Sequence, residues 1–192
     1  MDSAHSLDHI TRLTAQTESF KDVVARLQNK QQQILLHGLP STLAAFLAAH
    51  VRGVLDRQVL VVAANEDRAE QWRDDLQAIA GEDLVCYFPT WDVELYDRQS
   101  PDGEITGLRV EAASQLMRGE PTIVVTPAQA LLLPLIPPHA LELGTLELKI
   151  GVAQDPDALC SHLVDCGFER VPAIDGIGQF SLRGGILDIY PF

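Results

Sequence analysis

The stretch ILLHGLPSTLAAFLAAHVRGVLDRQVLVVAA, residues 34–64, contains a short apolar run, then an amphipathic pattern of helical period, then a second short apolar run. Such apolar runs are typical of strands buried on both faces, and in parallel sheets these strands alternate with helices. The stretch therefore predicts a buried strand at 34–38, a helix at 41–55 and a second buried strand at 59–64.

The same alternation continues along the chain. Asn65 is a candidate N-cap and Gly81 a candidate C-terminal stop for the next helix. Further elements are expected as follows: strand 84–88, a long loop 89–104, helix 105–119 and strand 122–126. We expect an α/β domain over residues 31–133, with a mostly parallel sheet and helices on both faces, preceded by a leading helix within residues 1–30.

The segment PLIPPHALELG, residues 134–144, interrupts this pattern with three prolines and a glycine and suggests a domain boundary. The following residues predict a small α+β domain over 134–192, with a strand at 146–150, a helix at 155–168 capped near Asp155, and short strands after it. The last strand candidate has no partner strand after it, so this second domain is expected to be truncated.

Charge and composition limit the classes of function. The net charge is −13, from 27 acidic and 14 basic residues, so autonomous nucleic-acid binding is not expected. No apolar stretch is long enough for a membrane span and no signal-peptide pattern is present, which favours a cytoplasmic location. The three cysteines include no CxxC pair, and Cys160, His162 and Cys166 lack the ligand spacing of a zinc site.

The turn after the first predicted strand is where a phosphate-binding loop would lie. The motif G-x-x-x-x-G-K-[ST], counted from Gly38, places its last three positions on Leu43, Ala44 and Ala45, and none of them matches. The chain has only three lysines, which are Lys21, Lys30 and Lys149.

We expect Pro40, Ser41 and Thr42 to start and cap a helix. The alternative for Gly38, Pro40, Ser41 and Thr42 is weak anion binding without hydrolysis. No catalytic residue and no metal site is predicted. The acids of the long loop are expected to be solvated, and the alternative for them is a metal site or a carboxylate dyad: Asp92, Glu94, Asp97, Asp102 and Glu104.

Several segments together resemble a known family. FPTWDVELYD, SPDGEITGLRVEAASQL, TIVVTPAQAL and GFERVPAIDGIGQFSLRGGILDIYPF are similar to the N-terminal module of the bacterial transcription-repair coupling factors (Mfd), which is itself similar to the N-terminal part of UvrB. The resemblance covers about residues 30–192. It implies a helicase-like domain that has lost its ATP site, followed by a domain that docks UvrA.

The resemblance also implies site residues. Arg170 and Arg183 match arginines of the UvrA-facing pattern, and Ser181 stands where that pattern has its middle arginine. Phe180 adds an aromatic residue, and arginine and aromatic residues are enriched in binding hot spots. The alternative for the arginines is that they are solvated strand residues. For the phenylalanines a place in the core is favoured, because alternating strands bury one face.

The predicted function is a non-catalytic interaction module that docks UvrA. RNA polymerase and DNA would contact other domains of the parent protein, and ATP would be used only by its downstream motor. One alternative is a nucleotide-binding domain of the ATPase or helicase type with an unorthodox phosphate loop. Another is a UvrB-like DNA-repair fragment, which the negative charge disfavours.

Overall fold

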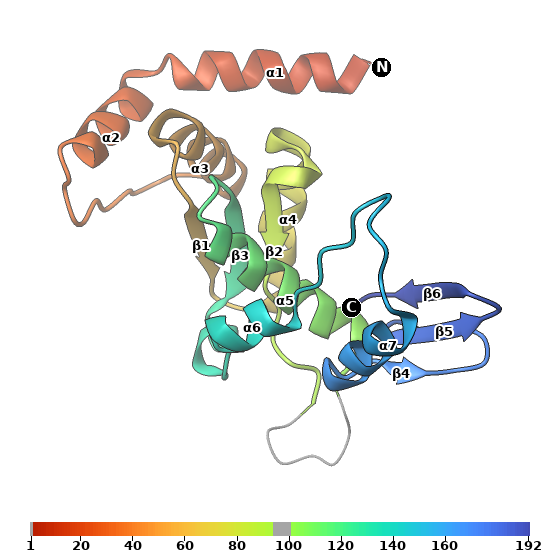
Figure 1. Cartoon of the computed structure of the whole chain (residues 1–192). Coiled ribbons are helices and arrows are strands. Elements are labelled where there is room, and N and C mark those ends of the chain that lie inside the picture. The colour runs from red at the N-terminus through yellow and green to blue at the C-terminus, as the bar shows by residue number, and fades with distance from the viewer. Residues whose placement is uncertain (1, 94–100) are drawn as a thin grey trace. The chain divides into compact units, whose positions relative to one another are not determined.

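The computed structural model describes residues 2–93 and 101–192, coloured along the chain in Figure 1. These residues form two compact units. The first contains residues 1–90 and 111–134, and the second contains residues 91–110 and 135–192. The α/β class predicted from the sequence is confirmed, because the first unit has a parallel three-stranded sheet and the second a small mixed sheet.

The sheet of the first unit has the order β1-β3-β2, formed by β1 (Val59–Ala63), β3 (Ile123–Pro127) and β2 (Val85–Tyr87). Both outer strands are parallel to β3. Their first residues, Val59 and Val85, both lie beside Ile123 of β3. β3 is buried along its whole length, as expected for a central parallel strand.

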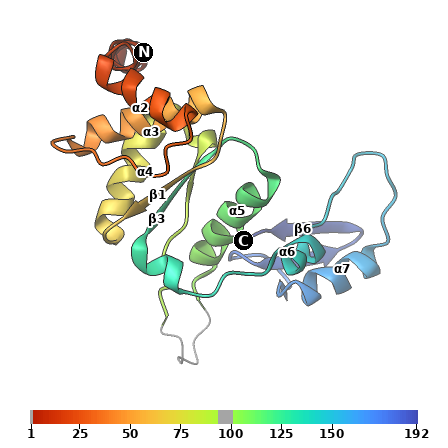
Figure 2. The ribbon, with the colours of Figure 1, turned by 90° about the vertical axis from the view of Figure 1, so that its left-hand side faces the viewer.

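Helices cover this sheet on both sides. Figure 2 shows α3 (Ser41–Leu55) and α4 (Glu66–Ala80) on one side of the sheet and α5 (Gly103–Arg118) on the other. On the α5 side, Ala112 packs with Cys86, Val124 and Ala130 in one buried cluster. Short 3-10 turns precede β2 and follow β3, at η1 (Glu82–Leu84) and η2 (Ala128–Leu132).

The predicted cap residues of α4 are confirmed. The Asn65 side chain accepts a hydrogen bond from the Arg68 N–H at 3.0 Å, and Gly81 is the C-cap. The single leading helix, in contrast, is wrong: the segment forms α1 (Asp2–Ala15) and α2 (Glu18–Gln28). The break occurs because Thr17 caps α2, accepting a hydrogen bond from the Phe20 N–H at 3.4 Å.

The predicted buried strand at 34–38 is wrong. These residues are irregular, and the Leu35 and Leu36 side chains are 75% and 43% exposed. A strand needs a neighbour to pair its backbone groups, and within the described residues β1, β2 and β3 pair only with one another. β1 is also less buried than predicted, since Leu60 and Val62 on one of its faces are 51% and 49% exposed.

The second unit is built around a sheet of order β4-β5-β6, with β4 (Glu169–Arg170), β5 (Gln179–Arg183) and β6 (Ile186–Tyr190). β4 is parallel to β5, and β6 is antiparallel to it. Its helices are α6 (Pro138–Gly144) and α7 (Pro156–Asp165). α7 packs on the sheet through Cys160 and Leu163, which contact the fully buried Phe180.

The sequence prediction for the second unit needs two corrections. The predicted strand at 146–150 is irregular, with Leu148 52% exposed and Ile150 fully exposed, because no neighbouring strand in the described residues pairs with it. The helix predicted for 155–168 begins after its Asp155 cap, as expected, but ends at Asp165. Gly167, with φ of +90°, turns the chain away from helical geometry.

Across the described ranges, none of the helices combines the length and the apolar character that crossing a membrane requires.

Candidate protein-docking site

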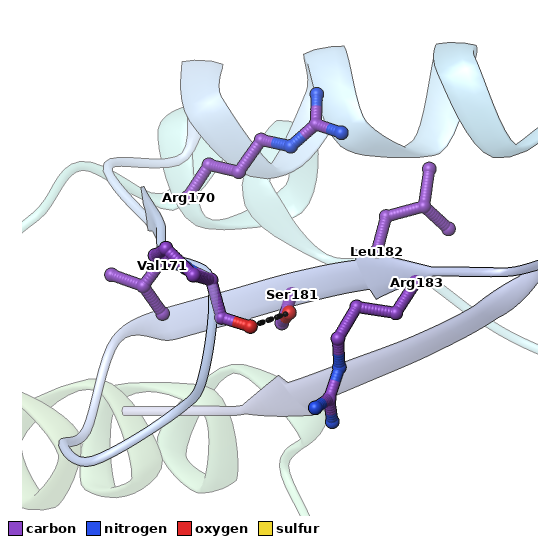
Figure 3. A pocket seen from close by; sticks show the side chains of 6 residues that line it. Arg170, Val171, Ser181, Leu182 and Arg183 are labelled. Carbon is purple, nitrogen blue, oxygen red and sulfur yellow. Dashed lines mark hydrogen bonds between the residues drawn. The ribbon is translucent and has the colours of Figure 1, made fainter.

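An open pocket of about 360 Å³ lies at the β4–β5 pair of the second unit. Three lining residues come from β5, and three come from the end of β4 and the segment after it. They are Ser181, Leu182 and Arg183, and Arg170, Val171 and Pro172. Figure 3 shows these residues from close by. The structure thus brings together, around one hollow, three of the four residues predicted for UvrA binding.

The strand register determines the face of the sheet on which each arginine lies. Arg170 lies beside Phe180 in the parallel β4–β5 pair, so it shares the face that Phe180 presents to α7. Arg183 is three residues after Phe180 on β5 and therefore lies on the opposite face. Figure 3 shows the two side chains extending to opposite sides of the strand. A partner that contacts both arginines must therefore reach both faces of this sheet.

Arg183 forms an exposed ion pair across the hairpin. Its Nη2 donates to Oδ2 of Asp188 at 2.9 Å, and the two side chains are 63% and 44% exposed. Asp188 lies directly opposite Ser181 in the β5–β6 pair, on the same face as Arg183. The only positive side chain on this face of β5 is therefore partly neutralised by a neighbour of the same chain.

Ser181 and Phe180 support the pocket from inside. Ser181 is 1% exposed, and its hydroxyl donates to the Pro172 carbonyl oxygen at 3.0 Å, which ties the segment after β4 to β5. Phe180 is 0% exposed and lies in the core with Leu163. The core position that strand alternation favours for Phe180 is thus confirmed, and its inclusion among the binding residues needs correction, because a side chain with no exposed area does not contact a partner.

Two exposed apolar residues extend the face of Arg183. Ile186 is 66% exposed and lies directly opposite Arg183, and Tyr190 is 50% exposed and lies opposite Gln179. Sequence reasoning did not include them in the candidate site. The sequence feature that could have identified them is the strand ILDIY, residues 186–190. Its alternating side chains place the first, third and fifth residues on the face away from the core.

The turn that was predicted to be a degenerate phosphate loop lies in the first unit. Gly38 has φ of +69°, and α3 begins at Ser41 with Pro40 as its N-cap residue. Pro40 is the N-cap residue and Ser41 starts the helix, as expected, although no side-chain cap hydrogen bond forms there. Ser41 and Thr42 stand in the first turn. Proline also has no backbone N–H to offer an anion.

The described part of the acidic loop is linked by hydrogen bonds to the start of the next helix. The Asp92 carboxylate accepts a hydrogen bond from the Asp102 N–H at 3.2 Å, and Asp102 Oδ1 accepts one from the Glu104 N–H at 2.7 Å. Next to them the guanidinium of Arg109 lies over the Trp91 ring, 4.3 Å from its centre. Burial lowers the pKa of Arg109 from its ordinary value.

No group of three or more metal-ligating side chains is present in residues 2–93 and 101–192. Two of the acids weighed for a metal site, Glu94 and Asp97, fall outside these residues. Of the cysteine and histidine residues considered for zinc, Cys166 Sγ and His162 Nε2 lie 3.5 Å apart, while Cys160 belongs to the buried core.

A polar cluster closes the end of β2 in the first unit. The Glu66 carboxylate accepts hydrogen bonds from the Tyr87 hydroxyl at 2.6 Å and from the Thr90 hydroxyl at 2.9 Å. The Arg73 guanidinium lies 5.0 Å from the centre of the Tyr87 ring. Burial, and then the hydrogen bond to Glu66, raise the pKa of Tyr87 well above its ordinary value. The neighbouring groups thus keep Tyr87 protonated, which suits a structural link between β2 and α4.

Comparisons with known proteins bear on the pocket directly. Residues 146–192, which include the whole β4–β5–β6 sheet, match the model of the UvrB interaction domain. The chain is also 26% identical over 185 residues to the transcription-repair-coupling factor of Bacillus subtilis, covering 96% of this chain. The predicted resemblance to transcription-repair-coupling factors is confirmed.

Relatives in staphylococci support the same assignment. The transcription-repair-coupling factors of Staphylococcus epidermidis and Staphylococcus aureus are 31% and 30% identical, each over 84% of this chain. The chain spans only 14–16% of the length of these relatives. The match therefore concerns one module of a much longer kind of protein.

Proposed function

We propose that this chain is a non-catalytic docking module that binds UvrA and so brings nucleotide excision repair to stalled RNA polymerase. The observation that carries the proposal is the pocket shared by Arg170 and Arg183 within the segment that matches the UvrB interaction domain. In this proposal residues 134–192 form the docking domain, and residues 31–133 form a helicase-like scaffold that has no working ATP site.

The chemistry of the pocket favours an acidic protein surface. Both arginines belong to a chain of net charge −13, and Arg183 is 63% exposed. A guanidinium offers several donors in a planar fork that fits a carboxylate. Ile186 and Tyr190 add exposed apolar area beside Arg183. Arginine and tyrosine next to apolar area is the composition typical of interface hot spots.

The remaining partners are part of the same proposal, because the chain spans only 14–16% of the length of its relatives. RNA polymerase and DNA would bind other domains of a longer parent protein, and the ATP-driven motor would also lie there. The absence of a lysine between Gly38 and Ala45 agrees with a scaffold role for the first unit.

A capture experiment tests the proposal. Purified UvrA is passed over immobilised wild-type chain, over Arg183→Ala and over Arg183→Lys. We expect strong retention by the wild type, loss with alanine and partial loss with lysine, because lysine keeps the charge but not the fork. Equal and strong retention by all three proteins would remove Arg183 from the site.

A further inference from the structure

Asp188 is the charged neighbour of Arg183 on the exposed face of the β5–β6 hairpin. The ion pair joins Nη2 to Oδ2 at 2.9 Å, and both side chains reach solvent. The strand register explains the contact. Asp188 lies opposite Ser181, and Ser181 is two residues before Arg183 on β5, so all three side chains lie on the same face. A carboxylate of this chain thus occupies a donor of the guanidinium that would bind a partner carboxylate.

We propose that Asp188 is an intramolecular competitor that weakens docking of an acidic partner at Arg183. The inference rests on the proposed function and names how the same site is regulated. A partner carboxylate either displaces Asp188 from Nη2 or uses the remaining donors of Arg183, and in both cases the Asp188 carboxylate stays close to the incoming negative charge. Like charges brought together at an interface oppose binding and help to reject unsuitable partners.

The opposite role, in which Asp188 holds Arg183 ready for a partner, is disfavoured by the geometry. The contact is made through Nη2, and exposed pairs of this kind contribute little to fixing a side chain. Glu169, the carboxylate beside Arg170 on β4, is next to that arginine in sequence and so lies on the other face of its strand. Among the described residues the structure gives a carboxylate ion pair to Arg183 and none to Arg170, so the proposed competition concerns Arg183.

The test is a titration of purified UvrA against four proteins: wild type, Asp188→Asn, Arg183→Ala and the double variant. Asparagine keeps the size of the side chain and removes its charge. We expect Asp188→Asn to bind about 3- to 10-fold more tightly than wild type at low salt, with the gain shrinking as salt rises. In the Arg183→Ala background the same change should alter the dissociation constant by less than about 2-fold.

Asp83→Asn is the matched control, because it changes the net charge equally at an exposed position of the first unit. It should bind like wild type. Weaker or unchanged binding by Asp188→Asn, when Arg183→Ala weakens binding, would overturn the competition and leave the proposed function intact. No saturable binding by any of the proteins would overturn both. Melting curves confirm that each variant is folded.

Discussion

The side chains of Arg170 and Arg183 project from opposite faces of one sheet yet line a single pocket. β4 contains only two residues, and the segment after it stays bonded to β5 through the Val171 N–H and the Pro172 carbonyl oxygen. A partner that reaches both faces of this sheet would meet one arginine on each side.

The two arginines are therefore expected to contribute separately to UvrA binding. Arg170→Ala and Arg183→Ala should each weaken binding by about 1–2 kcal/mol, as truncations of interface arginines do. Because the side chains lie on opposite faces, the double variant should equal the sum within about 0.5 kcal/mol. Isothermal titration of UvrA with the three variants measures this. A double variant no weaker than either single one would show that the arginines act on one shared group.

The docking unit depends on close packing at Gly178. This residue has φ of +75°, and a Cβ added to it would lie 2.5 Å from Cε1 of Phe192. Gly178→Ala should lower the free energy of unfolding by about 1–2 kcal/mol, because the backbone is strained for alanine and the ring must move. Urea denaturation measures the change.

Gly53→Ala is the control for this substitution. Gly53 lies inside α3 and its added Cβ would have no atom within 4 Å. Alanine there should stabilise the chain by about 0.5–1 kcal/mol. If both substitutions had the same effect, the close contact at Gly178 would not be the cause.

The hydrogen bond from Tyr87 to Glu66 predicts a dependence of stability on pH. Tyr87→Phe removes this 2.6 Å bond and should cost about 1–2 kcal/mol at pH 7. The pKa of Tyr87 is raised in the folded state, so its contribution is fully present below the pKa of about 10 for an unfolded tyrosine and is lost as pH rises above that value. The difference between wild type and variant should therefore shrink above pH 10.

Denaturation with urea at pH 7 and at pH 10.5 tests this prediction. Tyr190→Phe, at a side chain that is 50% exposed, is the matched control and should change stability little at either pH. A Tyr87→Phe cost that stays constant across this range would contradict the role given to the Glu66 bond.

The first unit is not expected to respond to nucleotide. The residues at the lysine and hydroxyl positions of the phosphate motif are alanines, and Pro40 removes a backbone donor from the turn. Millimolar Mg-ATP should leave the melting temperature unchanged, whereas a ligand at 100 times its dissociation constant would stabilise by about 2.7 kcal/mol. A clear upward shift would favour the nucleotide-binding alternative.

The sequence correctly predicted strands and helices that pair or pack with a neighbouring element in the structure. Strand β3 could be located from its apolar run and helix α4 from its cap residues, because both are local features of the sequence. The structure contains the strand and the caps. The apolar runs at 34–38 and 146–150 gave equally strong strand patterns, yet both are irregular. A local pattern shows that a segment suits a sheet but not whether a neighbouring strand is present to pair with it.

The candidate site could be predicted in part for a similar reason. Arg170 and Arg183 were identified by motif, and both line the pocket. Phe180 was included for its residue type, while strand alternation favoured the core, and the structure buries it there. Asp188 could not be recognised because its importance depends on the antiparallel register that places it beside Arg183.

The most direct test of the central claim is the dissociation constant of this chain for UvrA, measured for wild type, Arg183→Ala and Arg118→Ala. Arg118 is an exposed arginine at the end of α5 and is the matched control. We predict saturable binding by the wild type, about 10-fold or more weaker binding by Arg183→Ala, and wild-type binding by Arg118→Ala. Absence of saturable binding by the wild type, or equal weakening by the two substitutions, would contradict the account.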